Sequence, residues 1–362
     1  MFNSFRSEAK DEPQNDKESF NQKKRVLILG NGFDLDFGSD TRYSTYARGH
    51  FLHDTKSSGN LYRFLKTKYH EIPNKEWYNF ENEIEEYVKS IEEHHLSQEM
   101  IDADKSDFEQ LLTIGPTMNI MGWKTHKDER TDHVSANLIK NPSLFPNPVQ
   151  LWGRENSMAN KVLDFIARNP KYFFKIITFN YTDLSNYLEV AIDKFVHHDD
   201  IKTHEIYDAL SIVPIHIEPK EGDVKKAVLG INDSIIVPNG YEFLKKRNQI
   251  EKSRRESVIG DIVSADELVI FGHSLGDSDA DYFRPLFIDM FSEELSHERK
   301  LTFIMRGDSQ RIWDQMSKYS GRNNIMPKKA CNSVHFIDTS VIESLYEYRL
   351  LFQEDTQMSI RF

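Results

Sequence analysis

Four short polar segments each follow a run of apolar residues, and together they hold the residue types that could carry chemistry. The segments are Leu29–Asp34, Ile177–Asp183, Ile215–Ile217 and Phe271–Asp279. Asn180, in the second segment, can both donate to and accept from a sugar or an amide. His216, in the third, is the residue type that accepts a proton most readily near neutral pH. Both are candidates for catalysis; the alternatives are a turn asparagine and an ordinary packed histidine.

The first segment is suited to a close approach between backbone and ligand. Gly30 and Gly32 allow a sharp turn after a buried strand, and a helix starting at Phe33 would direct free N–H groups at an anion. The third glycine of a dinucleotide-binding fingerprint is replaced by Leu35. Asp34 could cap the helix or accept a hydrogen bond from a ribose hydroxyl. A ligand loop and a plain turn both fit this segment.

The fourth segment allows two interpretations. Residues 272–276 read Gly-His-Ser-Leu-Gly, which satisfies the nucleophile-elbow pattern of α/β hydrolases. Ser274 would then be the nucleophile and His335 the base, with Asp308 or Asp314 orienting the histidine. The alternative is a glycine-serine turn whose backbone and hydroxyl hold a nucleotide.

The sequence predicts no metal site. The acidic residues after Gly276 do not form a calcium loop, because Tyr282 and Ile288 replace the required Gly and Glu. Asp277, Asp279 and Asp281 are instead expected to be capping and first-turn acids of a helix. The single cysteine, Cys331, excludes a disulfide framework within the chain and any multi-cysteine zinc or iron–sulfur site.

The net charge and the hydropathy of the chain limit the classes of partner that it is expected to bind. The formal net charge of −12 over 362 residues disfavours non-specific binding to nucleic acid or to an anionic membrane. The most basic stretch, Lys245–Arg255, is expected to be a solvated helix face, and contact with a phosphate-bearing partner is the alternative. No apolar run approaches the length of a spanning helix, and the N-terminus shows no apolar signal core. We therefore expect a cytoplasmic protein with no membrane association.

The elements that must position these segments alternate between strand and helix. Strands are expected at Arg25–Leu29, Lys175–Phe179, Ile212–His216, Ala227–Ile231, Leu268–Gly272, Leu301–Met305 and Val334–Ile337. Helices are expected at Thr182–Lys194, Asp279–Met290, Ser309–Tyr319 and Ser340–Leu351. This order predicts an α/β fold with a doubly wound, mostly parallel sheet. The four polar segments then meet at the carboxyl edge of the sheet, where such folds bind ligands.

A large helical insertion is expected to interrupt this fold. We predict a disordered polar arm over residues 1–24, an α/β nucleotide-binding domain over residues 25–41 and 170–362, and a helical insertion or cap over residues 42–169. Within the insertion, Phe80, Ile84, Tyr87, Val88 and Ile91 share one helical face. The glutamates between Glu81 and Glu93 are expected to form the solvated face of that helix. A further helix is expected around residues 158–166, and residues 141–148 are expected to be a loop.

The order of the motifs resembles the AbiH family of bacterial phage abortive-infection proteins. The motifs are Gly30–Asp34, Trp77–Glu81, Thr178–Thr182, the strand-end His216, Leu229–Asp233 and Gly272–Asp279, and the resemblance covers about Arg25 to Phe287. It implies a role in antiviral defence, with phage resistance achieved by growth arrest or cell death. A trigger or partner protein derived from the phage and assembly into a homo-oligomer would be compatible with such a role.

The AbiH family in turn resembles the sirtuin-like NAD-binding proteins, which implies a Rossmann-type fold and NAD or a related nucleotide as the ligand. By that resemblance Gly30, Asn31 and Gly32 would line the phosphates, Asn180 would position the ribose or the attacking water, and His216 would be the general base. Gly272 and Ser274 would complete the pocket, and Asp34 and Asp277 are further candidates for ligand contact. The chain departs from the sirtuin pattern at Ile217, where a Gly is expected, and at Thr182, where an Asp is expected.

The leading hypothesis is therefore an effector of phage defence that hydrolyses NAD or a related nucleotide, in the manner of an NAD glycohydrolase. The departures at Thr182 and Ile217 favour, as a second hypothesis, a nucleotide-sensing module without catalysis. A serine hydrolase using Ser274 is the third. A nuclease contacting its substrate through Lys245–Arg255 is the last, because no convincing set of metal-binding carboxylates accompanies that stretch. Protein deacylation is disfavoured, because one cysteine cannot build the Cys₄ zinc module of the deacylating sirtuins.

Overall fold

The computed structural model describes residues 23–37, 59–72, 79–91, 96–114, 157–169, 171–181, 210–218, 226–292, 299–321 and 333–340, together with residues 43, 47, 51 and 184. The helices predicted at Thr182–Lys194 and Ser340–Leu351, the loop at residues 141–148 and Cys331 lie wholly or mainly outside these residues. So do residues 1–22 of the predicted arm, whereas Lys24 donates its backbone N–H to Asp266 at 2.7 Å.

Six parallel strands form the central sheet, in the order β3-β2-β1-β6-β7-β8. They are β1 (Arg25–Leu29), β2 (Lys175–Thr178), β3 (Ile212–Pro214), β6 (Glu267–Phe271), β7 (Lys300–Met305) and β8 (Val334–Asp338). Renumbered one to six along the chain, this is the order 3-2-1-4-5-6 of a Rossmann-like sheet. The predicted α/β class with a parallel sheet is confirmed. The chain reverses its direction of travel between β1 and β6, so a ligand crevice is expected at the carboxyl ends of those two strands.

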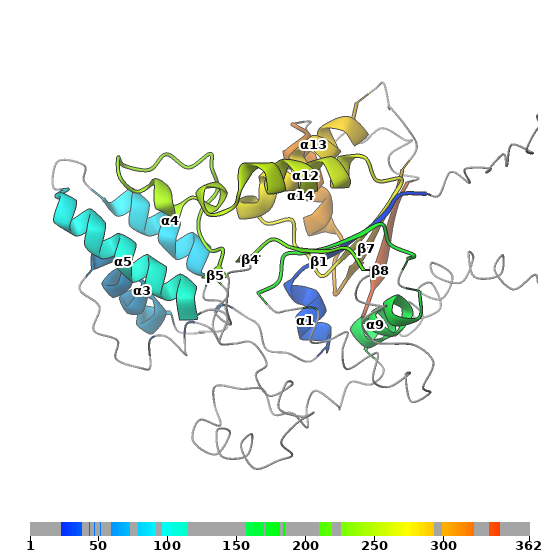
Figure 1. Ribbon diagram of the computed structural model, residues 1–362, viewed down its shortest axis with the longest axis horizontal. Coiled ribbons are helices and arrows are strands. Elements are labelled where there is room, and N and C mark those ends of the chain that lie inside the picture. Colours follow the sequence, from blue (N-terminus) through cyan, green and yellow to red (C-terminus); the bar gives the residue numbers. More distant parts are fainter. Residues whose placement is uncertain are drawn as a thin grey trace, which may run out of the picture.

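Successive side chains of each strand point to opposite faces of the sheet and belong to two hydrophobic cores, one on each face. Val26 and Ile28 of β1 belong to one cluster, whereas Leu27 and Leu29 belong to the other. The helices α12 (Lys252–Val263), α13 (Ala280–Met290) and α14 (Gln310–Ser320) cover the first face, and α1 (Asn31–Phe37) and α9 (Met158–Arg168) cover the second (Figure 1). The two central strands β1 and β6 are mainly apolar because helices bury both of their faces. The predicted boundary at residue 169 assigns α9 to the insertion, yet α9 packs on the sheet.

A third core lies beyond one edge of the sheet, where the helical insertion packs against residues 227–244 (Figure 1). It contains α3 (Asn60–Glu71), α4 (Phe80–Ser90) and α5 (Gln98–Ile114). The predicted apolar face of the α4 helix is buried, with Phe80, Ile84, Tyr87 and Val88 all inside. None of the helices within the described ranges has both the length and the apolar character needed to cross a lipid bilayer.

The segment between β3 and α12 differs from the prediction. The expected strand Ala227–Ile231 is wrong as a strand of the main sheet: only β5 (Lys226–Ala227) forms, and it pairs antiparallel with β4 (Ile217–Glu218). β5 ends at Ala227. Three residues later Gly230 has a φ of +151°, and a Cβ there would lie 2.1 Å from the carbonyl oxygen of Leu244. Three short 3₁₀ helices also lie near the carboxyl edge of the sheet: η4 (Glu242–Leu244), η5 (Lys246–Gln249) and η6 (Asp277–Asp279).

Candidate functional site

A cleft of about 600 Å³ opens at the carboxyl ends of β1 and β6, where the reversal of strand order predicts a ligand site. One wall comes from α4 of the insertion, and the opposite wall comes from the segment after β6 together with α13 and α14. Of the residues predicted from the sequence, five line this cleft: Asn31, His216, Gly272, Ser274 and Asp277. Gly30, Gly32, Asp34 and Asn180 do not belong to its lining.

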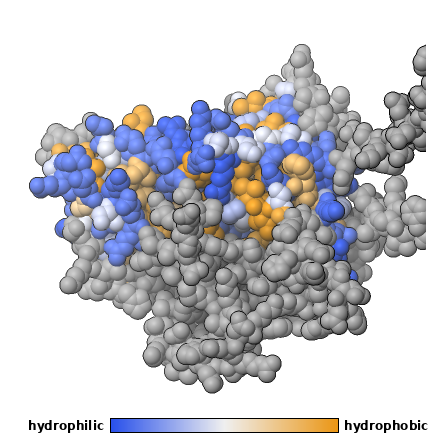
Figure 2. Space-filling view, viewed as in Figure 1, coloured by the Kyte–Doolittle hydropathy of each residue, from blue (hydrophilic) through white to orange (hydrophobic). Residues whose placement is uncertain are grey.

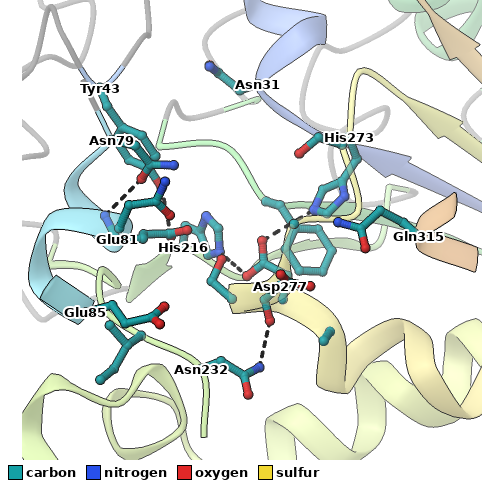
Figure 3. Close-up of a pocket in the computed structure, with 18 of the residues that line it drawn as sticks. Asn31, Tyr43, Asn79, Glu81, Glu85, His216, Asn232, His273, Asp277 and Gln315 are labelled. Carbon is teal, nitrogen blue, oxygen red and sulfur yellow. Dashed lines mark hydrogen bonds and ion pairs between the residues drawn. The ribbon is translucent and has the colours of Figure 1, made fainter. Parts of the chain in front are cut away.

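His216 and Asp279 form a buried pair in the lining of the cleft, and Figure 3 shows His216 there. The Nε2 atom of His216 lies 3.0 Å from Oδ1 of Asp279. Lys246 Nζ lies farther from the same nitrogen, at 3.4 Å, and has closer acceptors of its own. We therefore assign the proton of neutral His216 to Nε2, which donates to Asp279. The other ring nitrogen, Nδ1, is buried and has no hydrogen-bond partner among the described residues, so it is the atom that can accept a proton.

Lys246 connects this pair to the insertion. Its Nζ atom lies 3.0 Å from Asp279 Oδ1, 2.5 Å from Glu81 Oε1 and 3.0 Å from Ser278 Oγ. Only 7% of the lysine side chain and 15% of the Glu81 side chain are exposed. Such a buried cation is tolerated only when it is paired and hydrogen-bonded, and here α4, η5 and η6 each supply one part of the arrangement.

The protonation states follow from burial and from these neighbours. Burial lowers the pKa of His216 below its ordinary value of 6.5, and Lys246 lowers it further against the opposing effect of Asp279. Burial alone would raise the pKa of Asp279, but Lys246 and His216 hold that pKa well below its usual range. Burial would likewise lower the pKa of Lys246, but Asp279 and Glu81 raise it above its ordinary value. At neutral pH the site therefore contains an ammonium, ionised Asp279 and a neutral imidazole.

Aromatic rings fix the orientation of the two histidines in the cleft. The ring of Tyr181 lies 5.0 Å from that of His216 at an interplanar angle of 31°, and Phe179 meets His216 edge-on at 5.5 Å. His273 accepts the backbone N–H of Leu275 at Nδ1, which leaves its Nε2 protonated and directed at Asp279 Oδ2, 3.5 Å away. Asp279 thus orients two imidazoles at once.

Two tyrosines join the insertion to this group. Tyr43 donates to Glu81 Oε1 at 2.8 Å, and its hydroxyl lies 3.2 Å from that of Tyr181. Burial raises the pKa of both hydroxyls, and Glu81 beside them raises it further. Both tyrosines are therefore neutral donors at physiological pH. We call Glu81, His216, Lys246, His273 and Asp279 the polar cluster.

The glycine turn after β1 has a different role from the one expected. Gly30 N–H donates to the carbonyl of Phe271 and Gly32 N–H donates to that of Gly272, both at 2.8 Å. A Cβ on Gly30 would lie 2.5 Å from the Cα of His273. The glycines therefore let the loops after β1 and β6 interlock, and their amides are directed at protein carbonyls instead of at the cleft. Asn31 is the residue of this turn that lines the cleft.

Asn180 and Asp34 are paired beside the cleft, outside its lining. Both are buried, and the Nδ2 atom of Asn180 donates to Oδ1 of Asp34 at 2.8 Å. The sequence places Asn180 correctly at the carboxyl edge of β2, but its side chain links the β2 loop to α1. The direct ribose contact expected for Asn180 and Asp34 stays a prediction. Nδ2 of Asn180 is engaged by Asp34, whereas its Oδ1 atom is buried with no hydrogen-bond partner among the described residues.

The predicted serine triad does not assemble. Ser274 is exposed and lines the cleft, but no hydrogen bond connects it to a histidine within the described part of the chain. His335 is exposed in the middle of β8, where it is in register with Thr302 and, one strand further, with Val269. The proposed orienting acids bond elsewhere, Asp308 to Gln310 N–H and Asp314 to the Gln310 side chain.

Three members of the polar cluster were expected in other roles. Lys246 was placed on a solvated helix face and Glu81 on the solvated face of α4, yet both are largely buried and paired. Asp279 was expected to be a helix-capping acid, but it makes no side-chain capping bond and pairs with Lys246 and His216. Each of them looks like a surface charge locally, because its partners are distant in the sequence. The fourth, His273, was only part of the elbow pattern, and the one signal for it was its place directly after a strand.

The sequence matches the family model described as bacteriophage abortive infection AbiH over residues 26–303. That span includes the whole polar cluster and most of the central sheet. No curated protein matches the chain.

Proposed function

We propose, since the chain belongs to the AbiH family of bacteriophage abortive infection proteins, that it acts in phage defence through this cleft, by binding NAD or a related nucleotide and hydrolysing it. The single observation that carries the proposal is the His216–Asp279 pair. It lies in the cleft at the carboxyl ends of β1 and β6, where the strand order of the Rossmann-like sheet reverses. Parallel sheets of this order bind nucleotides at that position. A cleft of about 600 Å³ lies within the size range of small-molecule sites.

The chemistry would be attack of water on the anomeric carbon of the nicotinamide ribose. Nδ1 of His216 accepts a proton from the water, the oxygen forms a bond to the anomeric carbon, and nicotinamide leaves with the electron pair of the broken C–N bond. Asp279 accepts from Nε2 of His216 and stabilises the imidazolium that forms, the role of the carboxylate in hydrolytic triads. The low pKa of His216 supplies the neutral base that the first step requires.

The test is NAD turnover by purified protein and in infected cells, for wild type and for the variants His216→Ala, Asp279→Asn and His335→Ala. We expect the first two variants to lose at least about a hundredfold in turnover, the size of a general-base contribution. His335→Ala should match wild type, because this histidine is exposed on β8 and does not line the cleft. A wild-type protein that blocks phage while leaving NAD and related nucleotides intact would contradict the proposal.

A nucleotide sensor without catalysis is the second candidate, and one observation favours it. Nδ1 of His216 is enclosed, so an attacking water must enter a space that Tyr181 and Phe179 border. Calorimetry separates the two candidates. Nucleotide binding without turnover, together with phage protection that His216→Ala leaves unchanged, would identify a sensor.

A further inference from the structure

The wall of the cleft formed by α13 and α14 carries a group of cationic and amide side chains. Arg311, Gln315 and Lys318 follow one another at spacings of four and three residues, so they occupy one face of α14. All three line the cleft, as does Arg284 of the adjacent α13. The cationic side chains are exposed, which places them at the rim. The described part of the face in Figure 2 mixes hydrophilic with hydrophobic residues.

These side chains differ in whether they already have a hydrogen-bond or ion-pair partner in the protein. Lys318 Nζ contacts both carboxylate oxygens of Asp277 at 2.7 Å, so each charge offsets the other. Arg284 and Arg311 have no ion-pair or hydrogen-bond partner among the residues that the structure describes. The Oε1 atom of Gln315, four residues after Arg311 on α14, is buried and likewise unpartnered there. Two uncompensated guanidinium groups thus border one wall of a cleft in a chain whose net charge is −12.

The opposite wall carries carboxylates that are already paired. Glu81 and Glu85 of α4 line it, and Figure 3 places both on the other side of His216 from Gln315. Glu81 is paired with Lys246 and Glu85 with Lys89, so among its described residues this wall offers phosphate no unpaired cation, whereas guanidinium binds phosphate oxygens in bidentate pairs. The cleft is therefore polarised across its width, with an anion favoured only on the α13–α14 side.

We propose that Arg284 and Arg311 form the subsite for the phosphate groups of the ligand, and that this subsite selects ligands with two linked phosphates. The inference rests on the proposed function, because it assumes that the cleft takes a nucleotide. It adds the direction of binding: the diphosphate lies on the α13–α14 wall, and the sugar to be cleaved lies toward His216 and α4. The glycine turn expected to hold the phosphates is thereby replaced in that role by the two arginines.

Calorimetric titration with a ladder of ligands tests the subsite. The ligands are adenosine, AMP, ADP, NAD and inorganic pyrophosphate, and the proteins are wild type, Arg284→Gln, Arg311→Gln and the double variant. Lys252→Gln is the matched control, since it removes one positive charge from an exposed position of α12 outside the cleft. Because all these side chains are exposed, unfolding temperatures should stay unchanged, and they verify the fold of each variant.

We expect wild type to bind ADP and NAD more tightly than adenosine. Each arginine variant should lose about tenfold in affinity for ADP, NAD and pyrophosphate, the double variant about a hundredfold, and the control less than about twofold. Affinity for adenosine should not change. Equal binding of ADP by wild type and the double variant overturns the subsite, as does wild-type protein that binds neither ADP nor pyrophosphate.

Failure of the subsite and failure of the proposed function give different results. If wild type turns over NAD and the double variant does so with an unchanged KM, the subsite is wrong and the function stands. If wild type binds ADP through the arginines but hydrolyses no nucleotide, the subsite stands and hydrolysis is wrong.

Discussion

At the scale of single residues, the polar cluster combines two carboxylates with a single ammonium. Asp279 and Glu81 both contact Lys246, and His216 stays neutral beside them because burial and the lysine outweigh the attraction of Asp279. An imidazole with one nitrogen held by a carboxylate and the other unpartnered is arranged to receive a proton. Lys246 thus lowers the pKa of His216, and it has no direct part in the proposed hydrolysis.

The first prediction concerns that effect of Lys246. In Lys246→Met the positive charge beside His216 is lost while Asp279 remains, so the pKa of His216 should rise. NMR titration of labelled histidines measures this, with the His216 signal assigned by its loss in His216→Asn. Lys245→Met serves as the control, because Lys245 Nζ bonds to the carbonyl of Asp233. An unchanged or lowered pKa of His216 would contradict the role given to Lys246.

The same shift has a consequence for stability. The folded-state pKa of His216 lies below its unfolded value of about 6.5, so the unfolded state binds more protons in this range. The contribution of neutral His216 to the free energy of unfolding is therefore present above pH 6.5. It is lost as the pH falls toward the folded-state pKa. Unfolding of wild type by urea should show this loss as the pH is lowered below 6.5. In Lys246→Met the loss attributable to His216 should shrink, because the folded-state pKa moves toward the unfolded one.

Asn180 supports the second prediction. Asn180→Ala removes the buried hydrogen bond to Asp34 and should cost about 1–3 kcal/mol of unfolding free energy. Asn180→Asp should cost more, because it places a second carboxylate within hydrogen-bond distance of the first in a buried site. Urea denaturation gives both values. Asn82→Ala, at an exposed position of α4, should stay within about 0.5 kcal/mol of wild type. A stable Asn180→Ala protein that has lost turnover would instead indicate direct ligand contact.

At the scale of elements, the loops after β1 and β6 hold each other through bare backbone. Gly272 has a φ of +67°, and a Cβ there would lie 2.3 Å from the amide nitrogen of Phe33. Gly307 also has a positive φ, +89°, but a Cβ there would meet nothing within 4 Å. Substituting the two glycines therefore measures two different effects on the free energy of unfolding. At Gly307 only the backbone conformation is unfavourable, whereas at Gly272 a steric clash is added.

The third prediction compares these glycines. Gly307→Ala should cost about 1–2 kcal/mol, the penalty of a left-handed conformation for a residue with a Cβ. Gly272→Ala should cost at least about 3 kcal/mol, because the loops must also separate. Denaturation measures both changes. Equal costs would show that the two loops do not interlock as tightly as the contacts indicate.

Helix α4 reaches the sheet domain through one charged side chain, which leads to the fourth prediction. Glu81→Gln removes the charge that Lys246 faces across 2.5 Å and should cost about 3 kcal/mol, as when a buried pair loses one partner. Glu85→Gln is the matched control on the same helix, because its pair with Lys89 is largely exposed and should be worth less than about 0.5 kcal/mol. The measurement is guanidinium denaturation. Similar values for the two variants would mean that the contact with Lys246 does not stabilise the fold.

At the scale of the whole molecule, the sheet could be predicted from the sequence, but of the polar cluster only His216 could be predicted as a site residue. The strand Arg25–Leu29 has its predicted bounds because an unbroken apolar run needs burial on both faces, a local property. The predicted helices Asp279–Met290 and Ser309–Tyr319 begin and end within one residue of α13 and α14. Lys246 and Glu81 satisfy each other from positions far apart in the chain, and a charge is predicted as solvated unless its partner is known.

For the candidate site residues as well, the position along the sheet could be predicted from the sequence, but the contacts of the side chain could not. His216 was identified because a histidine after a strand of a parallel sheet must lie at the ligand edge. Asn180 shares that position, yet its side chain is directed at Asp34, because a direction depends on packing that no local pattern encodes. The glycines at 30 and 32 indicate a close approach correctly, but the group that approaches is the loop after β6.

The insertion and the sheet domain share one core, and this leads to the last prediction. The third hydrophobic cluster contains Phe80 and Phe108 of the insertion together with Leu229 and Tyr241 from the segment after β5. The hydroxyl of Tyr241 also donates to the buried Asp104 of α5 at 2.7 Å, a carboxylate that Tyr87 and the backbone N–H of Leu61 bond as well. Neither part can therefore expose its surface without uncovering apolar side chains of the other.

We accordingly expect the insertion and the sheet to unfold together. Hydrogen exchange followed by mass spectrometry along a urea series should give the same midpoint for peptides of α5 and of α13, as for one cooperative unit. Tyr241→Phe should lower both midpoints equally, because it removes a buried bond that joins the two parts. If α5 instead loses protection at a lower urea concentration than α13, the insertion is a separately stable cap. The polar cluster would then lose Glu81 whenever that cap opens, and binding in the cleft would depend on its closure.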